Sequence, residues 1–168
     1  DVWDEYMEKQ VVSYRKSSAF SESPEAIAVW LHLAEIAAEK VETRPYDRIA
    51  FRRLLTDLRS LTVTPPDHFL SEIAERCSSV GVAFVRVPDL KGTHISGAAF
   101  WLSGQKATAA VSLRYRTNDH FWFTFFHEAA HIFLHGKKAV FIDGEEATTV
   151  REEEEANAYA GELLIPDK

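Results

Sequence analysis

Hydrophobic side chains recur at helical spacing near the start of the chain. Ser23 followed by Pro24 is typical of a helix start, because serine caps free amides and proline needs no amide hydrogen there. From this point to Glu39-Lys40 the apolar positions fall on one face, which comprises Ile27, Trp30, Leu31, Ala34 and Ala38. We therefore expect an amphipathic helix over residues 24–40.

Two further helices are predicted before residue 80. The first covers about residues 47–60, with an apolar stripe of Ile49, Leu54, Leu55, Leu58 and Leu61. The second follows Pro65-Pro66-Asp67 and continues to about residue 79, with Gly81 as its stop. Its apolar positions are Phe69, Leu70, Ile73, Ala74 and Cys77.

After Gly81 the pattern changes to that of β-strands. Residues 82–87 are β-branched and aromatic and are bounded by Pro88-Asp89, which predicts a strand. Residues 97–103 and 108–113 are two more such runs, separated by Gly104-Gln105-Lys106, and we expect them to form a hairpin. Helices followed by a small sheet and further helices indicate an α+β fold.

The segment 120–135 is apolar on almost every side. Asn118-Asp119 precedes it as the expected cap and Gly136 ends it. A helix without a polar face is a buried helix, so its polar residues need partners. A last helix is predicted over residues 151–164, stopped by Pro166, with Ala156, Tyr159, Ala160, Leu163 and Leu164 on its apolar face.

Length and composition exclude several classes of protein. The 168 residues contain one cysteine, so neither a disulfide framework nor a cysteine zinc site can form within the chain. No apolar run reaches the ~20 residues that cross a bilayer, and we expect no membrane association. The chain begins at Asp1 rather than Met, so we expect it to be part of a longer protein.

The net charge of −7 has a local origin. Residues 143–155 hold seven of the 26 acidic residues and one of the 19 basic ones, which leaves a net charge of −1 elsewhere. The first 60 residues contain nine basic and eleven acidic side chains and no basic recognition helix. We therefore expect no direct nucleic-acid binding by this chain.

The candidate chemistry lies in the sequence His127-Glu128-Ala129-Ala130-His131. Residues four apart lie above one another on a helix, so both imidazoles can reach one metal ion. The glutamate between them can accept a proton from metal-bound water. Three protein ligands and one open position are typical of catalytic zinc, so a third ligand is needed.

Several residues compete for the role of third ligand. His135 lies eight residues after His127, about 12 Å along a helix, too far to share the ion, and we expect it near the free carbonyls of the helix end. In the acidic segment, Glu152 and Glu153 both border the apolar face of the last helix. We favour Glu153, because Asn157 stacks above it and can hydrogen-bond a ligating histidine; Glu152 is the reserve. Glu154 and Glu155 are expected to be solvated.

Both blocks together resemble the ImmA/IrrE family of metallo-endopeptidases. The sequence from His127 to His135 carries that family's H-E-x-x-H pattern, and residues 153–160 carry its E-x-x-A-N-x-[FY]-A pattern. The match covers about residues 65–166, with alanines at 129 and 130 where the family commonly has leucine and glycine. The resemblance implies a thermolysin-like zinc site with His127, His131 and Glu153 as ligands and Glu128 as general base.

The resemblance also implies a biological setting. Members are intracellular bacterial or phage proteins, which implies a cytoplasmic location, and characterised ones cleave helix-turn-helix repressors that control stress or mobile-element genes. Many follow an XRE-type DNA-binding domain, so we expect residues 1–64 to be a helical connecting region and 65–168 the peptidase-like domain. The alternative is a zinc-binding sensor or partner-binding module of a regulator or antitoxin, with little or latent proteolysis.

Substrate contacts are less well defined by the sequence. An extended substrate segment would add to an exposed strand edge, and residues 97–103 are the candidate for this edge. No residue declares itself as an additional oxyanion donor. The candidates are Tyr115, Arg116, His120 and Tyr159.

Overall fold

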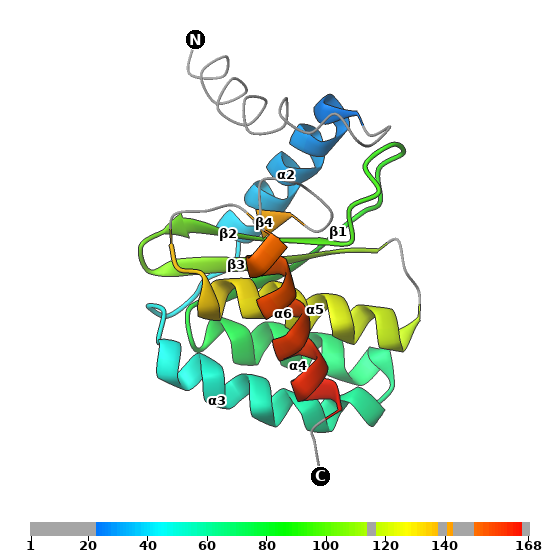
Figure 1. Cartoon of the computed structure of the whole chain (residues 1–168). Coiled ribbons are helices and arrows are strands. Elements are labelled where there is room, and N and C mark those ends of the chain that lie inside the picture. The colour runs from blue at the N-terminus through cyan, green and yellow to red at the C-terminus, as the bar shows by residue number, and fades with distance from the viewer. Residues whose placement is uncertain (1–22, 114–116, 138–140, 143–149, 166–168) are drawn as a thin grey trace.

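The structure is a computed structural model that describes residues 23–113, 117–137, 141–142 and 150–165. A four-stranded sheet in the order β1-β3-β2-β4 lies at its centre (Figure 1). β1 runs parallel to β3, whereas β2 is antiparallel to both β3 and β4. The strand bounds are β1 Val82–Val87, β2 Gly97–Ser103, β3 Lys106–Ser112 and β4 Phe141–Ile142.

The predicted hairpin of β2 and β3 is confirmed, although β3 begins two residues earlier than expected. The expectation that residues 97–103 offer a free edge is contradicted at the start of β2. Ala98 and Ala99 pair with β4 on the side opposite β3, so β2 is an inner strand there. In the described sheet, β4 forms the edge beside β2.

Helices cover both faces of the sheet (Figure 1). α2 (Pro24–Glu39) lies on one face, and α3 (Arg48–Leu58), α4 (Pro66–Ser78) and α5 (Asn118–Leu134) lie on the other. A short 3-10 helix, η1 (Arg59–Val63), follows α3, and α6 (Val150–Leu164) crosses α5. This arrangement confirms the α+β fold. Within the described segments, no helix has both the length and the apolar character that a membrane span needs.

The strands divide the hydrophobic core in two, because successive strand side chains point to opposite faces. Ala83 and Val85 of β1 pack with Trp30 of α2 in the smaller core. Val82 and Phe84 of the same strand belong to the larger core with α3, α4, α5 and α6. Helices of the expected 1–64 region thus contribute to both cores, and the division of the chain at residue 64 stays a prediction.

The helix over residues 47–60 differs from its prediction in one face position. Ile49 is 68% exposed, whereas Phe51, which we did not place on the stripe, is fully buried. Phe51, Leu54, Leu55 and Leu58 follow the i, i+3, i+4, i+7 spacing, and Ile49 lies about 200° around the helix from Phe51. The face of α3 that packs into the core is therefore the one that carries Phe51 and the three leucines, and Ile49 lies outside it.

The start of α5 also differs from its prediction. Thr117, rather than Asn118 or Asp119, is the N-cap, because its backbone is extended while that of Asn118 is helical. Asp119 lies in the first helical turn. The Thr117 side chain and the His120 amide hydrogen-bond this carboxylate and lower its pKa. An acidic residue there is favourable because of the partial positive charge of the helix start.

Candidate metal centre

Aromatic packing fixes the position of α5. Trp122 lies 4.8 Å from Phe69 of α4 between ring centroids, and Phe125 lies 5.6 Å from Phe84 of β1. Trp122 also stacks on Phe126 of the next turn at 5.5 Å. Such aromatic contacts each add about 0.5–1.5 kcal/mol beyond area burial. They anchor α5 between α4 and the sheet.

The opposite side of α5 carries the polar residues predicted to form the site. His127, Glu128 and His131 are 3%, 0% and 1% exposed. The Nε2 atoms of the two histidines lie 3.0 Å apart. From α6, Glu153 places one oxygen 3.2 Å from Nε2 of His127 and the other 3.4 Å from Nε2 of His131. His127, His131 and Glu153 thus form a candidate metal site, in which Glu153 rather than Glu152 joins the histidines.

The hydrogen-bond partner of His127 on the side away from Glu153 indicates which ring nitrogen carries the proton. The Nδ1 atom lies 3.0 Å from Oδ1 of Asn157, on the same helix as Glu153. An amide oxygen can only accept, so Nδ1 of His127 donates and its Nε2 keeps a lone pair. This lone pair faces the Glu153 carboxylate. Asn157 therefore occupies the place that the sequence suggested for it.

Electrostatics at the cluster call for a cation. Burial lowers the pKa of His131, which favours its neutral, lone-pair-bearing form. Burial would raise the pKa of Glu153, but hydrogen bonds from His127 and His131, which form when a proton occupies their Nε2 atoms, lower it to about 2, so it is ionised at neutral pH. Lone pairs and a carboxylate that converge in a buried place need a proton or a metal ion between them.

The spacing of the three ligand atoms suits a tetrahedral ion. Zinc bonds of about 2.0–2.1 Å at tetrahedral angles separate neighbouring ligand atoms by about 3.3 Å. The separations of 3.0, 3.2 and 3.4 Å lie close to this value. The donor set of two imidazoles and a carboxylate is also one that zinc uses at catalytic sites. The residues present therefore fit a zinc ion with an open fourth position.

The backbone of Gly97 closely approaches the side chain of Glu128, and only a glycine leaves room for it there. A Cβ atom added to Gly97, at the start of β2, would lie 2.6 Å from Oε1 and 2.8 Å from Cγ of Glu128. It would also lie 2.9 Å from Thr124. This close approach was not predicted, although a glycine inside a strand pattern is a known sign of one.

The acidic segment contains an interaction that sequence reasoning missed. Glu155, expected to be solvated, lies 3.1 Å from Nε2 of His135 and 2.8 Å from Nε of Arg151. The His135 side chain is 5% exposed, and its Nδ1 lies 2.9 Å from Nδ1 of His131. His135 is therefore the outer partner of a candidate ligand as well as the C-cap of α5. The spacing of four residues between His131 and His135 could have predicted this contact, because residues at i and i+4 are neighbours on a helix. Glu154 is exposed, as expected.

The remaining candidates have different positions. Tyr115 and Arg116 lie outside the described residues. His120 is exposed in the first turn of α5, about two turns before His127. Tyr159 stacks on Phe133, with centroids 5.6 Å apart, and burial raises its pKa. None of these placements assigns an oxyanion donor, and that role stays a prediction.

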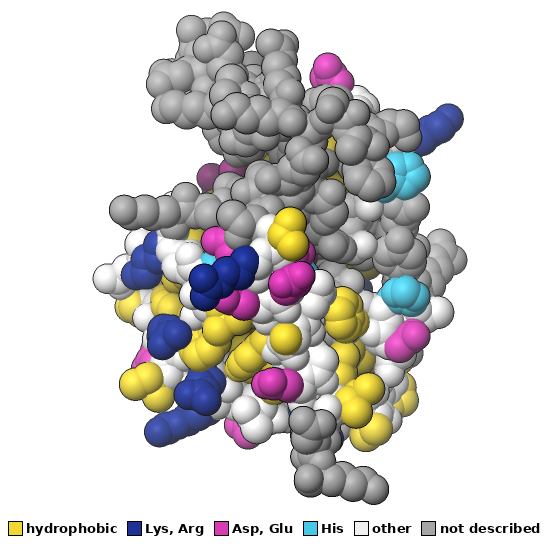
Figure 2. Space-filling view, viewed as in Figure 1, with side chains coloured by type: hydrophobic (Ala, Val, Ile, Leu, Met, Phe, Trp, Pro, Cys, Tyr) yellow, Lys and Arg dark blue, Asp and Glu magenta, His cyan; other side chains and the backbone are white. Residues whose placement is uncertain are grey.

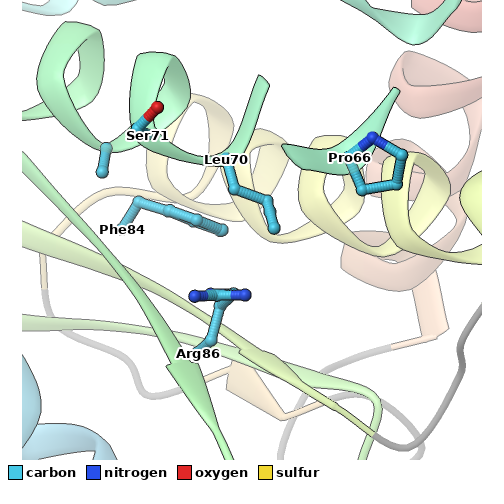
Figure 3. Close-up of a pocket in the computed structure, with 6 residues that line it drawn as sticks. Pro66, Leu70, Ser71, Phe84 and Arg86 are labelled. Atoms are coloured by element: carbon cyan, nitrogen blue, oxygen red, sulfur yellow. The ribbon is translucent and has the colours of Figure 1, made fainter. Parts of the chain in front are cut away.

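The surface around the site is mixed in charge. Acidic and basic side chains lie together where the first turns of α6 reach the face shown in Figure 2. A separate groove of about 550 Å³ lies between α4 and β1, where Arg86 extends toward Leu70 and Phe84 (Figure 3). Its lining includes no residue of the metal cluster. The groove is therefore a different feature from the candidate metal centre.

Comparison with known proteins identifies the family of this site. The model of the family Peptidase_M78, an IrrE N-terminal-like domain, matches residues 85–168, half of the chain. This range includes both histidines and Glu153 of the metal cluster. No curated protein matches the sequence. The chain belongs to the IrrE N-terminal-like family of peptidases, and His127, His131 and Glu153 are its candidate metal site.

Proposed function

We propose that the protein is a zinc-dependent endopeptidase of the gluzincin type. The observation that supports this most strongly is that the side chain of Glu128 is fully buried. Glu128 directly follows His127, and the Nε2 atom of His127 lies 3.0 Å from the Nε2 atom of His131. A site that only stored or sensed metal would not need an additional buried carboxyl beside its ligands. Burying a carboxyl group costs free energy, and a role as general base explains why a buried carboxyl is present here.

In the proposed mechanism His127, His131 and Glu153 hold the zinc ion. When bound, zinc would lower the pKa of water and polarise a peptide carbonyl. Glu128 accepts the proton of the attacking water as the new C–O bond forms. It then delivers this proton to the amide nitrogen, so that the C–N bond breaks and the amine leaves. The absence of a side chain at Gly97 leaves room for the carboxyl of Glu128, and Asn157 holds the ring of His127.

We propose a helix-turn-helix repressor as the substrate, within a stress-response or mobile-element switch in the cytoplasm. This part rests on the family and its sequence patterns. The near-neutral remainder of the chain is compatible with a DNA-binding protein as the partner, cut rather than held. An extended substrate segment would add to the sheet at β4, the edge strand that pairs with β2, rather than to β2 itself.

Two measurements test this proposal. Elemental analysis of the purified protein should find about one zinc per chain, lost in His127→Ala and in His131→Ala, because three protein ligands are needed to hold the ion. A wild-type protein that takes up no zinc would refute the site.

The second measurement addresses the reaction. Purified helix-turn-helix repressors are incubated with the zinc-loaded protein, and fragments are identified by mass spectrometry. We expect a defined cut that disappears in Glu128→Gln, while this variant keeps its zinc, since Glu128 is not a ligand. Zinc binding without cleavage of any repressor would instead favour a metal-binding regulatory module.

A further inference from the structure

A series of hydrogen-bonded side chains connects the surface of α6 to His131, one of the candidate metal ligands. Nε of Arg151 lies 2.8 Å from one oxygen of Glu155, whose other oxygen lies 3.1 Å from Nε2 of His135. Nδ1 of His135 lies 2.9 Å from Nδ1 of His131. This series thus joins the start of α6 to the last turn of α5, where the two helices cross (Figure 1).

When His135 is neutral, the Glu155 carboxylate determines the direction of each hydrogen bond. Glu155 is a carboxylate and can only accept, so Nε2 of His135 donates to it. A neutral His135 then has a lone pair on Nδ1. The proton between the two Nδ1 atoms then belongs to His131, which donates it to His135. Nε2 of His131 is left with a lone pair directed at His127 and Glu153.

The opposite arrangement would disable the ligand. If Nδ1 of His131 accepted a proton from His135, the remaining proton of the neutral His131 ring would reside on Nε2. That nitrogen could not bind a metal. His127 avoids this outcome through a direct bond to the Asn157 amide, whereas His131 depends on a second histidine and a carboxylate.

We infer that Glu155 and His135 are positioning residues that hold His131 in its metal-binding tautomer, so that an acidic side chain at the surface sets the zinc affinity of the buried site. This inference rests on the proposed zinc site. Neither residue is itself one of the three candidate metal ligands. Loss of such outer partners typically weakens metal binding by about 10–100-fold.

Zinc affinity in the full chain, measured by competition with a chromophoric chelator, tests the inference. We expect binding about 10–100-fold weaker in Glu155→Ala and in His135→Phe, which keeps a ring but accepts no hydrogen bond. Glu155→Gln should recover much of the affinity, because its amide oxygen still accepts from His135. Glu154→Ala is the matched control, since it removes the same charge from the neighbouring exposed position.

A second readout separates tautomer control from general damage. In the zinc-free protein, ¹⁵N spectra of the imidazole nitrogens should show His131 protonated at Nδ1 in the wild type and shifted toward Nε2 in Glu155→Ala. Equal zinc affinity in Glu155→Ala and Glu154→Ala, or an unchanged His131 tautomer, would overturn the inference and leave the proposed function intact. A wild-type chain without zinc affinity would overturn both.

Discussion

The most local test of the site is the substitution Gly97→Ala, which adds one methyl group beside Glu128. The new Cβ would lie 2.6 Å from Oε1 of Glu128, where ordinary contacts begin at 3.4 Å, so about 0.8 Å has to be gained by movement. The strand cannot retreat freely, because Gly97 is paired with Val111 of β3. Glu128 must therefore turn away from its place, or α5 must shift.

The expected magnitude follows from this displacement. A misplacement of about 1 Å in a catalytic group can cost roughly 100-fold in rate. We expect kcat on a cleaved repressor to fall by about 10–100-fold. Zinc affinity should stay close to wild type, since the three atoms nearest to the added Cβ belong to Glu128 and Thr124 rather than to a metal ligand. Overpacking should also lower the free energy of unfolding by about 1–3 kcal/mol.

Gly104→Ala is the matched control, because a Cβ there meets no atom within 4 Å and the position needs no left-handed backbone. Cleavage rate, zinc affinity and urea unfolding are measured for both variants. A folded Gly97→Ala protein with wild-type kcat would refute the view that the general base needs the space left by this glycine. A parallel loss of zinc would show that the disturbance reaches the ligands.

Three further predictions concern the fold. Phe51→Ala should lower the free energy of unfolding by about 3–5 kcal/mol and Ile49→Ala by no more than about 0.5 kcal/mol in urea titrations, and equal effects would contradict the assigned helix face. Asp47→Ala should cost about 0.5–2 kcal/mol in the same titration, because one carboxylate oxygen accepts from the amides of Ile49 and Ala50 at 2.9 Å; Asp47→Asn should retain most of this. Burial raises the pKa of Cys77 to about 12, so its thiol should react with Ellman's reagent at pH 8 only after unfolding in guanidinium, and rapid reaction of the native protein would contradict its burial.

Local patterns in the sequence were enough to predict most elements. The spacing of apolar residues and the start and stop residues predicted α2, α4 and β1 to within about two residues, because these signals act between near neighbours along the chain. The same holds for the pair His127 and His131, whose four-residue spacing brings them together on any regular helix. In α3 the local signal was ambiguous, and packing decided between Ile49 and Phe51.

Contacts between distant segments required the tertiary structure. Periodicity placed Glu152 and Glu153 equally near the apolar face of α6, and only the docking of α6 on α5 brings Glu153 to the two histidines. The same crossing brings Glu155 to His135.

The close approach of Gly97 to Glu128 could not be predicted from the sequence either. It depends on how closely β2 approaches α5, and Gly97 lies 31 residues before Glu128 in the chain. The sequence by itself therefore determined which residues could bind a metal and act as a base. The packing of β2, α5 and α6 decided which of them meet, because side-chain distances across helices and strands depend on the docking of whole elements rather than on spacing along one of them.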